Sequence, residues 1–115
     1  MRILVTGGRN YSDWIKLRRV LDEQVEGFDP EEVILIHGGA TGADTLARQW
    51  ATTRGIHAAE VNPLWDKFGA SAGPIRNRAM LMLRPDVAVA FPGGPGTASM
   101  VKLLYADGVD VVTVT

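Results

Sequence analysis

The feature that most constrains the fold is a regular alternation of short apolar runs with amphipathic segments. Five runs are rich in Val, Ile, Leu or Ala, and none of them alternates cleanly between polar and apolar residues. That composition is typical of parallel strands that are buried on both faces. The predicted strands are Arg2–Thr6, Val33–His37, His57–Val61, Asp86–Phe91 and Asp110–Val114.

The segments between these runs have the spacing of helices. In the first of them, Trp14, Leu17, Leu21 and Val25 recur every three or four positions and so share one face. Three later segments repeat this spacing, around residues 46–51, 75–83 and 98–105. Strict alternation of strand and helix predicts a parallel sheet with right-handed crossovers and helices on both faces. We therefore predict a three-layer, Rossmann-like α/β fold whose five-stranded parallel sheet has the order 3-2-1-4-5.

Length and composition narrow the class of protein further. The 115 residues fit a single domain, 1–115, and 46% of them are hydrophobic, as in an ordinary globular domain. No apolar run approaches the roughly 18 residues of a membrane span, and the first residues enter a strand without a signal sequence, so we expect a cytoplasmic protein without a membrane partner. The net charge of -1 makes a nucleic-acid partner an unfavoured expectation.

The composition also gives no indication of a bound metal or cofactor. The chain has no cysteine, which excludes disulfides, thiolate nucleophiles and Cys-ligated zinc. His37 and His57 lie near strand ends without a His or carboxylate partner at ligand spacing, so we expect them to be structural. We predict no metal site and no bound cofactor.

Glycine placement is the most informative feature for function. Glycine-rich segments follow the first, second and fourth predicted strands, and each precedes a helix: Thr6-Gly7-Gly8-Arg9-Asn10, His37-Gly38-Gly39-Ala40-Thr41-Gly42-Ala43-Asp44 and Pro92-Gly93-Gly94-Pro95-Gly96-Thr97. Open α/β sheets bind ligands beyond the carboxyl ends of their strands, at the point where the strand order reverses. Backbone N–H groups in such loops can form a concave nest for an anion, aided by the following helix dipole. Three loops converging on one crevice therefore predict a phosphate cradle, although each glycine alone could serve only a tight turn.

Two known nucleotide motifs are missing from these loops. No Gly-Lys-Ser/Thr follows any of them, so none is a Walker A sequence. The first loop does not complete Gly-x-Gly-x-x-Gly, which argues against ordinary dinucleotide dehydrogenase chemistry. The remaining interpretation is a nucleotide or nucleotide-derived ligand held largely by backbone groups.

Several side chains are candidates for contacts with that ligand. Arg76 and Asn77 are expected to open the third long helix, where a guanidinium would combine its charge with a helix N-terminus. Arg9 and Asn10 could reach the same anion. Thr97 is expected to cap the fourth helix and to contact a phosphate as well. A base could stack on one of the aromatic side chains near the crevice, Tyr11, Trp65 or Phe68.

Asp44 has two interpretations. It follows Thr41 by three residues, which is the spacing of a capping box at a helix start. Alternatively it binds a ribose hydroxyl or positions a water, and it is the candidate carboxylate for any hydrolytic chemistry. The one long connection, Asn62–Gly73, is a further candidate functional segment because long loops often are.

Taken together, these motifs resemble a known superfamily. Pro92-Gly93-Gly94-Pro95-Gly96-Thr97 resembles the PGGxGT motif of the superfamily that unites the lonely-guy phosphoribohydrolases with the Smf/DprA DNA-processing proteins. The glycine segments at 6–9 and 38–44, with Ala72-Gly73-Pro74-Ile75-Arg76-Asn77, look like its short YspA-type branch, which occurs in bacteria and their phages. The resemblance spans nearly the whole chain and implies a Rossmann-like fold that binds nucleotides or nucleotide-derived ligands.

The resemblance does not carry over the activity of the phosphoribohydrolases. Those enzymes extend the motif to PGGxGTxxE, and the glutamate belongs to their catalytic site. Met100 stands at that position here, and a methionine cannot act as an acid, a base or a counter-charge. Met80, Met82 and Met100 are expected to fill the core or to form a dimer face.

Three functions follow, in order of preference. The first is a module that senses, carries or sequesters a nucleotide-derived molecule through its phosphate–ribose part. The second is a nucleotide or nucleoside-monophosphate hydrolase that uses Asp44 or another carboxylate. The third is a binder of single-stranded nucleic acid. A homodimer through the exposed part of the third or fourth helix is a further expectation, since so small a domain has limited room to enclose a ligand.

Overall fold

The computed structural model describes residues 1–115 and contains one five-stranded parallel sheet. The strands are β1 (Arg2–Thr6), β2 (Ile34–His37), β3 (His57–Glu60), β4 (Val87–Ala90) and β5 (Asp110–Thr113). Their order is β3-β2-β1-β4-β5, and every neighbouring pair is parallel. The predicted α/β class and strand order are therefore confirmed. The order reverses between β1 and β4, where Thr6 pairs with Ala90 at the carboxyl end of the sheet.

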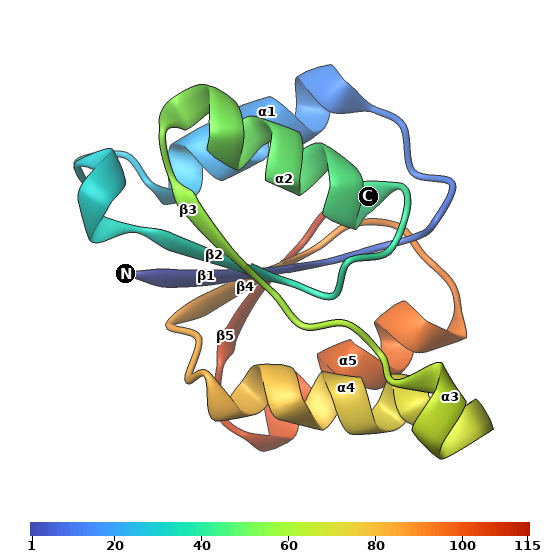
Figure 1. The fold of residues 1–115 in the computed structure, drawn as a ribbon. Helices are drawn as coiled ribbons and strands as arrows, with labels where there is room; N and C mark the ends of the chain where they lie inside the picture. The colour runs from blue at the N-terminus through green and yellow to red at the C-terminus, as the bar shows by residue number, and fades with distance from the viewer.

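Helices cover both faces of this sheet, as Figure 1 shows. The helices are α1 (Trp14–Gln24), α2 (Ala43–Arg54), α3 (Trp65–Phe68), α4 (Ala72–Met82) and α5 (Pro95–Ala106), with short 3-10 turns at Pro30–Glu32 and Gly69–Ser71. Helices α1 and α2 lie on one face, and α4 and α5 lie on the other. None of them is long and apolar enough to cross a bilayer.

Two apolar clusters fill the spaces between the layers. The larger one joins α1 and α2 to the sheet and includes Ile3, Leu17 and the fully buried Trp50. The smaller one joins α4 and α5 to the opposite face of the sheet and includes Leu4 and Met100. Because adjacent residues of β1 point to opposite faces, Ile3 and Leu4 belong to different clusters. The central strand thus holds both layers together.

Two sequence-based expectations need correction. The two edge strands are not buried on both faces, because three of the four residues of β3 are exposed and none of the four residues of β5 is buried. The segment Asn62–Gly73 is not one long loop, since it contains α3, a 3-10 turn and the first two residues of α4. Helix α4 also begins earlier than the expected start near residue 75, because proline is tolerated in the first turn of a helix, where its missing N–H has no partner to lose.

Candidate functional site

The loops after β1 and β4 are joined to each other by backbone hydrogen bonds at one side of the site. The Gly8 N–H donates to the Pro92 carbonyl at 2.9 Å, and the Phe91 N–H donates to the Thr6 carbonyl at 2.9 Å. A Cβ on Gly7 would lie 2.6 Å from Cβ of Ala43 and 2.9 Å from Cβ of Phe91. Glycine is therefore required at position 7 because the two loops and α2 approach so closely.

The loop after β2 joins the same cluster through Gly42. Gly42 has a φ of +73°, and a Cβ there would strike the Gly8 carbonyl and the backbone of Arg9. The Ala43 N–H donates to the Gly8 carbonyl at 3.1 Å, and the Thr41 hydroxyl donates to the Arg9 carbonyl at 3.2 Å. All three glycine loops thus meet at the carboxyl ends of the strands, as the sequence predicted.

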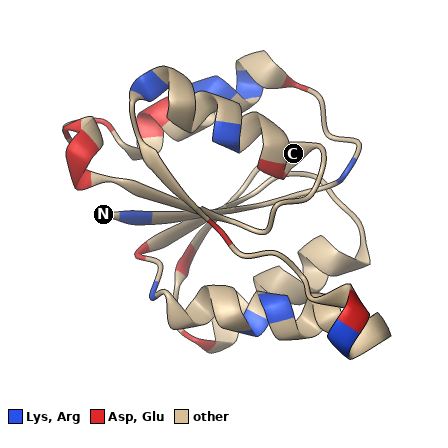
Figure 2. Ribbon diagram, in the orientation of Figure 1, with Lys and Arg blue, Asp and Glu red and all other residues tan.

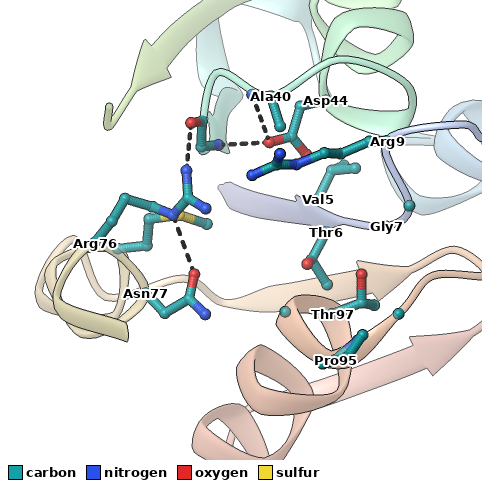
Figure 3. A pocket seen from close by; sticks show the side chains of 15 residues that line it. Val5, Thr6, Gly7, Arg9, Ala40, Asp44, Arg76, Asn77, Pro95 and Thr97 are labelled. Carbon is teal, nitrogen blue, oxygen red and sulfur yellow. Dashed lines mark hydrogen bonds between the residues drawn. The ribbon is translucent and has the colours of Figure 1, made fainter. Parts of the chain in front are cut away.

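A cavity of about 400 Å³ opens between these loops. Figure 3 shows Arg76 and Asn77 on one side of it, Asp44 and Arg9 above, and Thr97 and Pro95 opposite. The sequence-predicted site residues that line it are Gly7, Gly8, Arg9, Gly38, Asp44, Arg76, Asn77, Gly94, Gly96 and Thr97. Sequence analysis missed five other lining residues, Val5, Thr6, Ala40, Met80 and Pro95.

The expected nest of free N–H groups is only partly present. The Gly8 N–H is used by the Pro92 carbonyl. The Gly38 and Ala40 N–H groups donate to Oδ2 of Asp44 at 3.1 and 3.2 Å. These three N–H groups are therefore not available to an anion.

Asp44 braces the loop after β2 instead of capping α2. The N-cap of α2 is Gly42, and no side chain caps it, so the capping-box interpretation with Thr41 is wrong. Asp44 is buried, at 6% exposure. Burial raises the pKa of its carboxyl group, and the hydrogen bonds from Ala40 and Gly38 together with the charges of His37 and Arg76 oppose that rise. No hydrogen bond uses Oδ1, which leaves this oxygen as an acceptor in the lining of the cavity.

The first turn of α5 supplies the free donors of the site. Its N-cap is Gly94, no side chain caps it, and Pro95 occupies the first turn. Thr97 therefore does not cap this helix as predicted, because it is the third residue inside the first turn. The Gly96 and Thr97 N–H groups belong to the helix start, where no intrahelical carbonyl is available. They line the cavity together with the Thr97 side chain.

Arg76 lies deeper in its helix than the sequence indicated. Helix α4 begins at Ala72, so Arg76 and Asn77 occupy its second turn and cannot combine with the helix N-terminus. The half-buried guanidinium donates from Nη1 to the Gly38 carbonyl at 2.5 Å and from Nε to Oδ1 of Asn77 at 3.1 Å. Burial lowers the pKa of Arg76, and the nearby charge of Arg9 also lowers it, while that of Asp44 opposes both.

Neither arginine of the cavity is neutralised by an ion pair. The two side-chain ion pairs closer than 4 Å join Arg54 to Asp22 and His37 to Glu60. Arg9 and Arg76 thus present two guanidinium groups to one cavity, close enough for the charge of Arg9 to act on Arg76. Asp44, the one carboxylate in the lining, acts on Arg76 without forming an ion pair with it, so the two guanidinium groups outnumber the negative charge of the cavity and favour an anionic ligand.

A second cavity of about 370 Å³ adjoins the first. Gly39 and Thr41, two further predicted site residues, line it together with Asn62, Pro63 and Trp65. The other two aromatic candidates lie elsewhere. Tyr11 packs against Phe91 with ring centroids 5.1 Å apart, and Phe68 has the ammonium group of Lys67 over its ring.

Four predicted site residues line neither cavity. They are Asn10, Gly42, Pro92 and Gly93. Asn10 is exposed to solvent. The other three hold the loops together, since a Cβ on Gly93 would strike the Thr97 hydroxyl and lie 2.7 Å from the Gly8 nitrogen. Gly42, Pro92 and Gly93 therefore support the loops that line the cavity without lining it themselves.

Comparisons with known proteins identify the family of the chain and a similar fold. Residues 1–68, more than half of the chain, match the sequence profile of the YspA, cpYpsA-related SLOG family. The chain belongs to this SLOG family. The resemblance to a YspA-type branch is thereby confirmed.

One phage protein and one solved structure are similar to this SLOG chain. It is 31% identical over 122 residues to the Gene 61 protein of Mycobacterium phage D29, which covers 96% of this chain and 94% of that protein. The X-ray structure of DNA processing protein A (DprA) from Streptococcus pneumoniae superposes with a TM-score of 0.56 and 18% identity. The superposition covers 96% of this chain and 58% of DprA, so the chain spans little more than half of that structure, and the likeness concerns the fold alone.

Met100, which stands where the PGGxGTxxE motif has its glutamate, is a core residue in this SLOG chain. Met100 is 1% exposed and packs with Leu4, Ile36 and Leu104 beneath the sheet. It does not line the cavity, whereas Met80 of the same cluster does. Met82 is 79% exposed on α4 and so is not a core residue. Asp44 is consequently the one carboxylate in the cavity lining.

His37 has a carboxylate neighbour that its sequence position concealed. The register of β2 and β3 pairs His37 with Glu60, and Nε2 lies 3.8 Å from Oε1 of Glu60. The Gly39 N–H donates to Nδ1 at 3.1 Å, so the neutral ring carries its proton on Nε2, which has no hydrogen-bond partner. Burial lowers the pKa of His37, against the opposing charges of Asp44 and Glu60. No three His, Asp or Glu side chains gather as a metal-binding group would.

Proposed function

We propose that the first cavity binds the phosphate–ribose part of a nucleotide-derived molecule, and that the protein senses, carries or sequesters this molecule. The observation that carries the proposal is the pair of guanidinium groups of Arg9 and Arg76. They line one cavity with no carboxylate within ion-pair distance, across from the uncapped start of α5. A phosphate fits such a site because it accepts from arginine and from helix N–H groups together.

The polar groups of the cavity also suggest how the ligand lies. Its phosphate would accept hydrogen bonds from the N–H groups of Gly96 and Thr97 and from the Thr97 hydroxyl. The guanidinium of Arg76 would face the same phosphate. The free Oδ1 of Asp44 would accept a hydrogen bond from a ribose hydroxyl, a donor that a phosphate lacks at neutral pH. A phosphorylated ribose matches both ends of the cavity.

Hydrolysis is the second candidate function, and Asp44 is the observation that favours it. Its carboxyl group has a pKa raised mainly by burial and lines the cavity, as an acid or base catalyst would. Glycoside hydrolysis generally uses two carboxylates, however, and Asp44 has no acidic partner in the cavity lining. The hydrolase therefore ranks below the binding module.

Nucleic-acid binding ranks third. Figure 2 shows basic residues on both helical layers, and acidic residues lie on both layers as well. The net charge of -1 adds no long-range attraction for a polyanion. The affinity for such a partner would fall more steeply with salt than that for a single nucleotide, because more phosphates are neutralised and more counterions are released.

The test is a thermal-shift panel at fixed salt with AMP, ADP, ATP, GTP, NAD, ADP-ribose and ribose 5-phosphate, with product analysis of each mixture. A ligand at a hundred times its Kd adds about 2.7 kcal/mol to the free energy of unfolding, which raises Tm by several degrees. A shift with the ligand recovered intact supports the binding module, and cleaved products support the hydrolase. Absence of a shift with every compound contradicts the proposal.

Arg76→Glu tests the site itself. It places a carboxylate against the phosphate, so we expect most of the affinity to be lost. Arg78→Glu is the matched control, because Arg78 is exposed on the same helix and lines neither cavity. Equal affinity of the Arg76→Glu variant and the wild type would remove Arg76 from the site.

A further inference from the structure

The second cavity is joined to the first through the arginines. The two cavities share Arg9, Gly38, Ala40 and Arg76 in their linings. A ligand in the first cavity can therefore extend past the guanidinium groups into the second without leaving the protein surface. The second cavity, of about 370 Å³, contains neither Asp44 nor the start of α5, so its chemistry differs from that of the phosphate–ribose site.

Trp65 gives this second cavity an aromatic wall. Its side chain is 48% exposed although it lines the cavity, whereas Trp50 is fully buried in the core. Helix α3 brings it beside the start of α4, as Figure 1 shows, and a Cβ on Gly73 would lie 3.7 Å from Cη2 of Trp65. The outer end of the indole thus lies against Gly73, which has no side chain, while much of Trp65 remains exposed and open to a ligand.

An amide stands beside this aromatic wall. Asn62 lines the cavity, and its Nδ2 donates to Oε2 of Glu60 at 3.1 Å. A Cβ on Gly39 would strike Oδ1 of Asn62, so the amide is held against the loop after β2. An amide has both a donor and an acceptor, and this pair can recognise the hydrogen-bonding edge of a base.

We propose that the second cavity is a base subsite, in which the base of a nucleoside 5′-phosphate stacks on Trp65 and presents its edge to Asn62. This inference rests on the proposed function, because it takes the phosphate and ribose to lie in the first cavity. The ribose then lies at the end of the first cavity that adjoins the second, beside Arg9 and Arg76, and the base extends from it into the second cavity. Trp65 is thereby a specificity-determining residue: it distinguishes a nucleotide from a sugar phosphate.

The experiment compares ligands that differ in the base alone. Titration calorimetry would measure binding of AMP, GMP, CMP, UMP and ribose 5-phosphate to the wild type, Trp65→Ala and Trp65→Phe. Loss of stacking weakens binding roughly 5- to 150-fold. We expect Trp65→Ala to weaken the best-bound nucleotide by such a factor while ribose 5-phosphate changes less than about twofold, and Trp65→Phe to retain most of the affinity.

Other outcomes overturn the inference in distinguishable ways. If ribose 5-phosphate binds as tightly as every nucleotide, the base has no subsite, and the proposed function stands alone. If Trp65→Ala weakens both classes of ligand equally, the residue supports the loop instead of the base. If it changes no affinity but alters the oligomeric state, Trp65 is a contact between two copies of the chain. If none of the five compounds binds the wild type, the subsite falls together with the nucleoside-monophosphate form of the proposed function.

Discussion

Replacing Asp44 tests whether this buried carboxylate holds the loop after β2 in place. Its Oδ2 accepts from the Gly38 and Ala40 N–H groups at 3.1 and 3.2 Å, and the side chain is 6% exposed. Asp44→Ala leaves two backbone donors without an acceptor, at about 1–3 kcal/mol each. Relief of the desolvated charge offsets part of this loss. The net loss should be about 2–4 kcal/mol in the free energy of unfolding, or roughly 8–16 °C in Tm.

Asp44→Asn separates the hydrogen bonds from the charge. The amide oxygen occupies the place of Oδ2 and can accept from both N–H groups, so we expect a loss of about 1 kcal/mol or less. Urea unfolding followed by tryptophan fluorescence measures both variants, and Asp66→Ala serves as the control because Asp66 is exposed on α3. Exposed substitutions change stability by about 0.5 kcal/mol at most. An Asp44→Ala variant as stable as this control would refute the bracing role.

Two further predictions concern the loops. Gly93→Ala should lower Tm and abolish ligand binding, because its Cβ would strike the Thr97 hydroxyl and lie 2.7 Å from the Gly8 nitrogen. The control Gly96→Ala places its Cβ where no atom lies within 4 Å, so it should keep or raise Tm. Equal Tm values of the two variants in a thermal-shift assay would contradict the packing argument. Because burial lowers the pKa of His37 in the folded protein, the unfolded chain binds a proton more readily, so stability should fall as pH drops below about 6.5. His37→Asn keeps an acceptor for the Gly39 N–H and should flatten this part of the stability–pH curve; a curve as steep as that of the wild type would assign the pH dependence to other groups.

Sequence patterns predicted the fold well because they are local. Strand and helix periodicity determine each element separately, and the handedness of βαβ crossovers then leaves few arrangements of five parallel strands. The exposure of β3 escaped this reasoning, because its Ala58 and Ala59 look the same at an edge as in the centre of a sheet. The helical start at Ala72 escaped it too, because Gly73-Pro74 reads as a break unless the helix has already begun.

The site was harder to predict than the fold because it depends on contacts between distant segments. The sequence located the glycine loops, but not that Asp44 consumes the N–H groups of one loop and Pro92 that of another. The hydrophobic periodicity of the sequence does not show which distant groups accept hydrogen bonds from these N–H groups. Likewise, three aromatic residues were equal candidates for stacking, and only the position of α3 against α4 sets Trp65 apart from Tyr11 and Phe68.

Met100, which replaces the glutamate of the PGGxGTxxE motif, affects the cavity through its packing in the smaller apolar cluster. A carboxylate at that position would lie among Leu4, Ile36 and Leu104, where an unpaired charge costs several kcal/mol. The methionine instead completes the apolar cluster that supports Met80, and Met80 forms part of the cavity lining. The cavity therefore adjoins an apolar layer, and its positive charge comes from Arg9 and Arg76. Under the proposed function this site holds an anion, and any chemistry on the bound ligand would have to begin at Asp44, the one carboxylate in the lining.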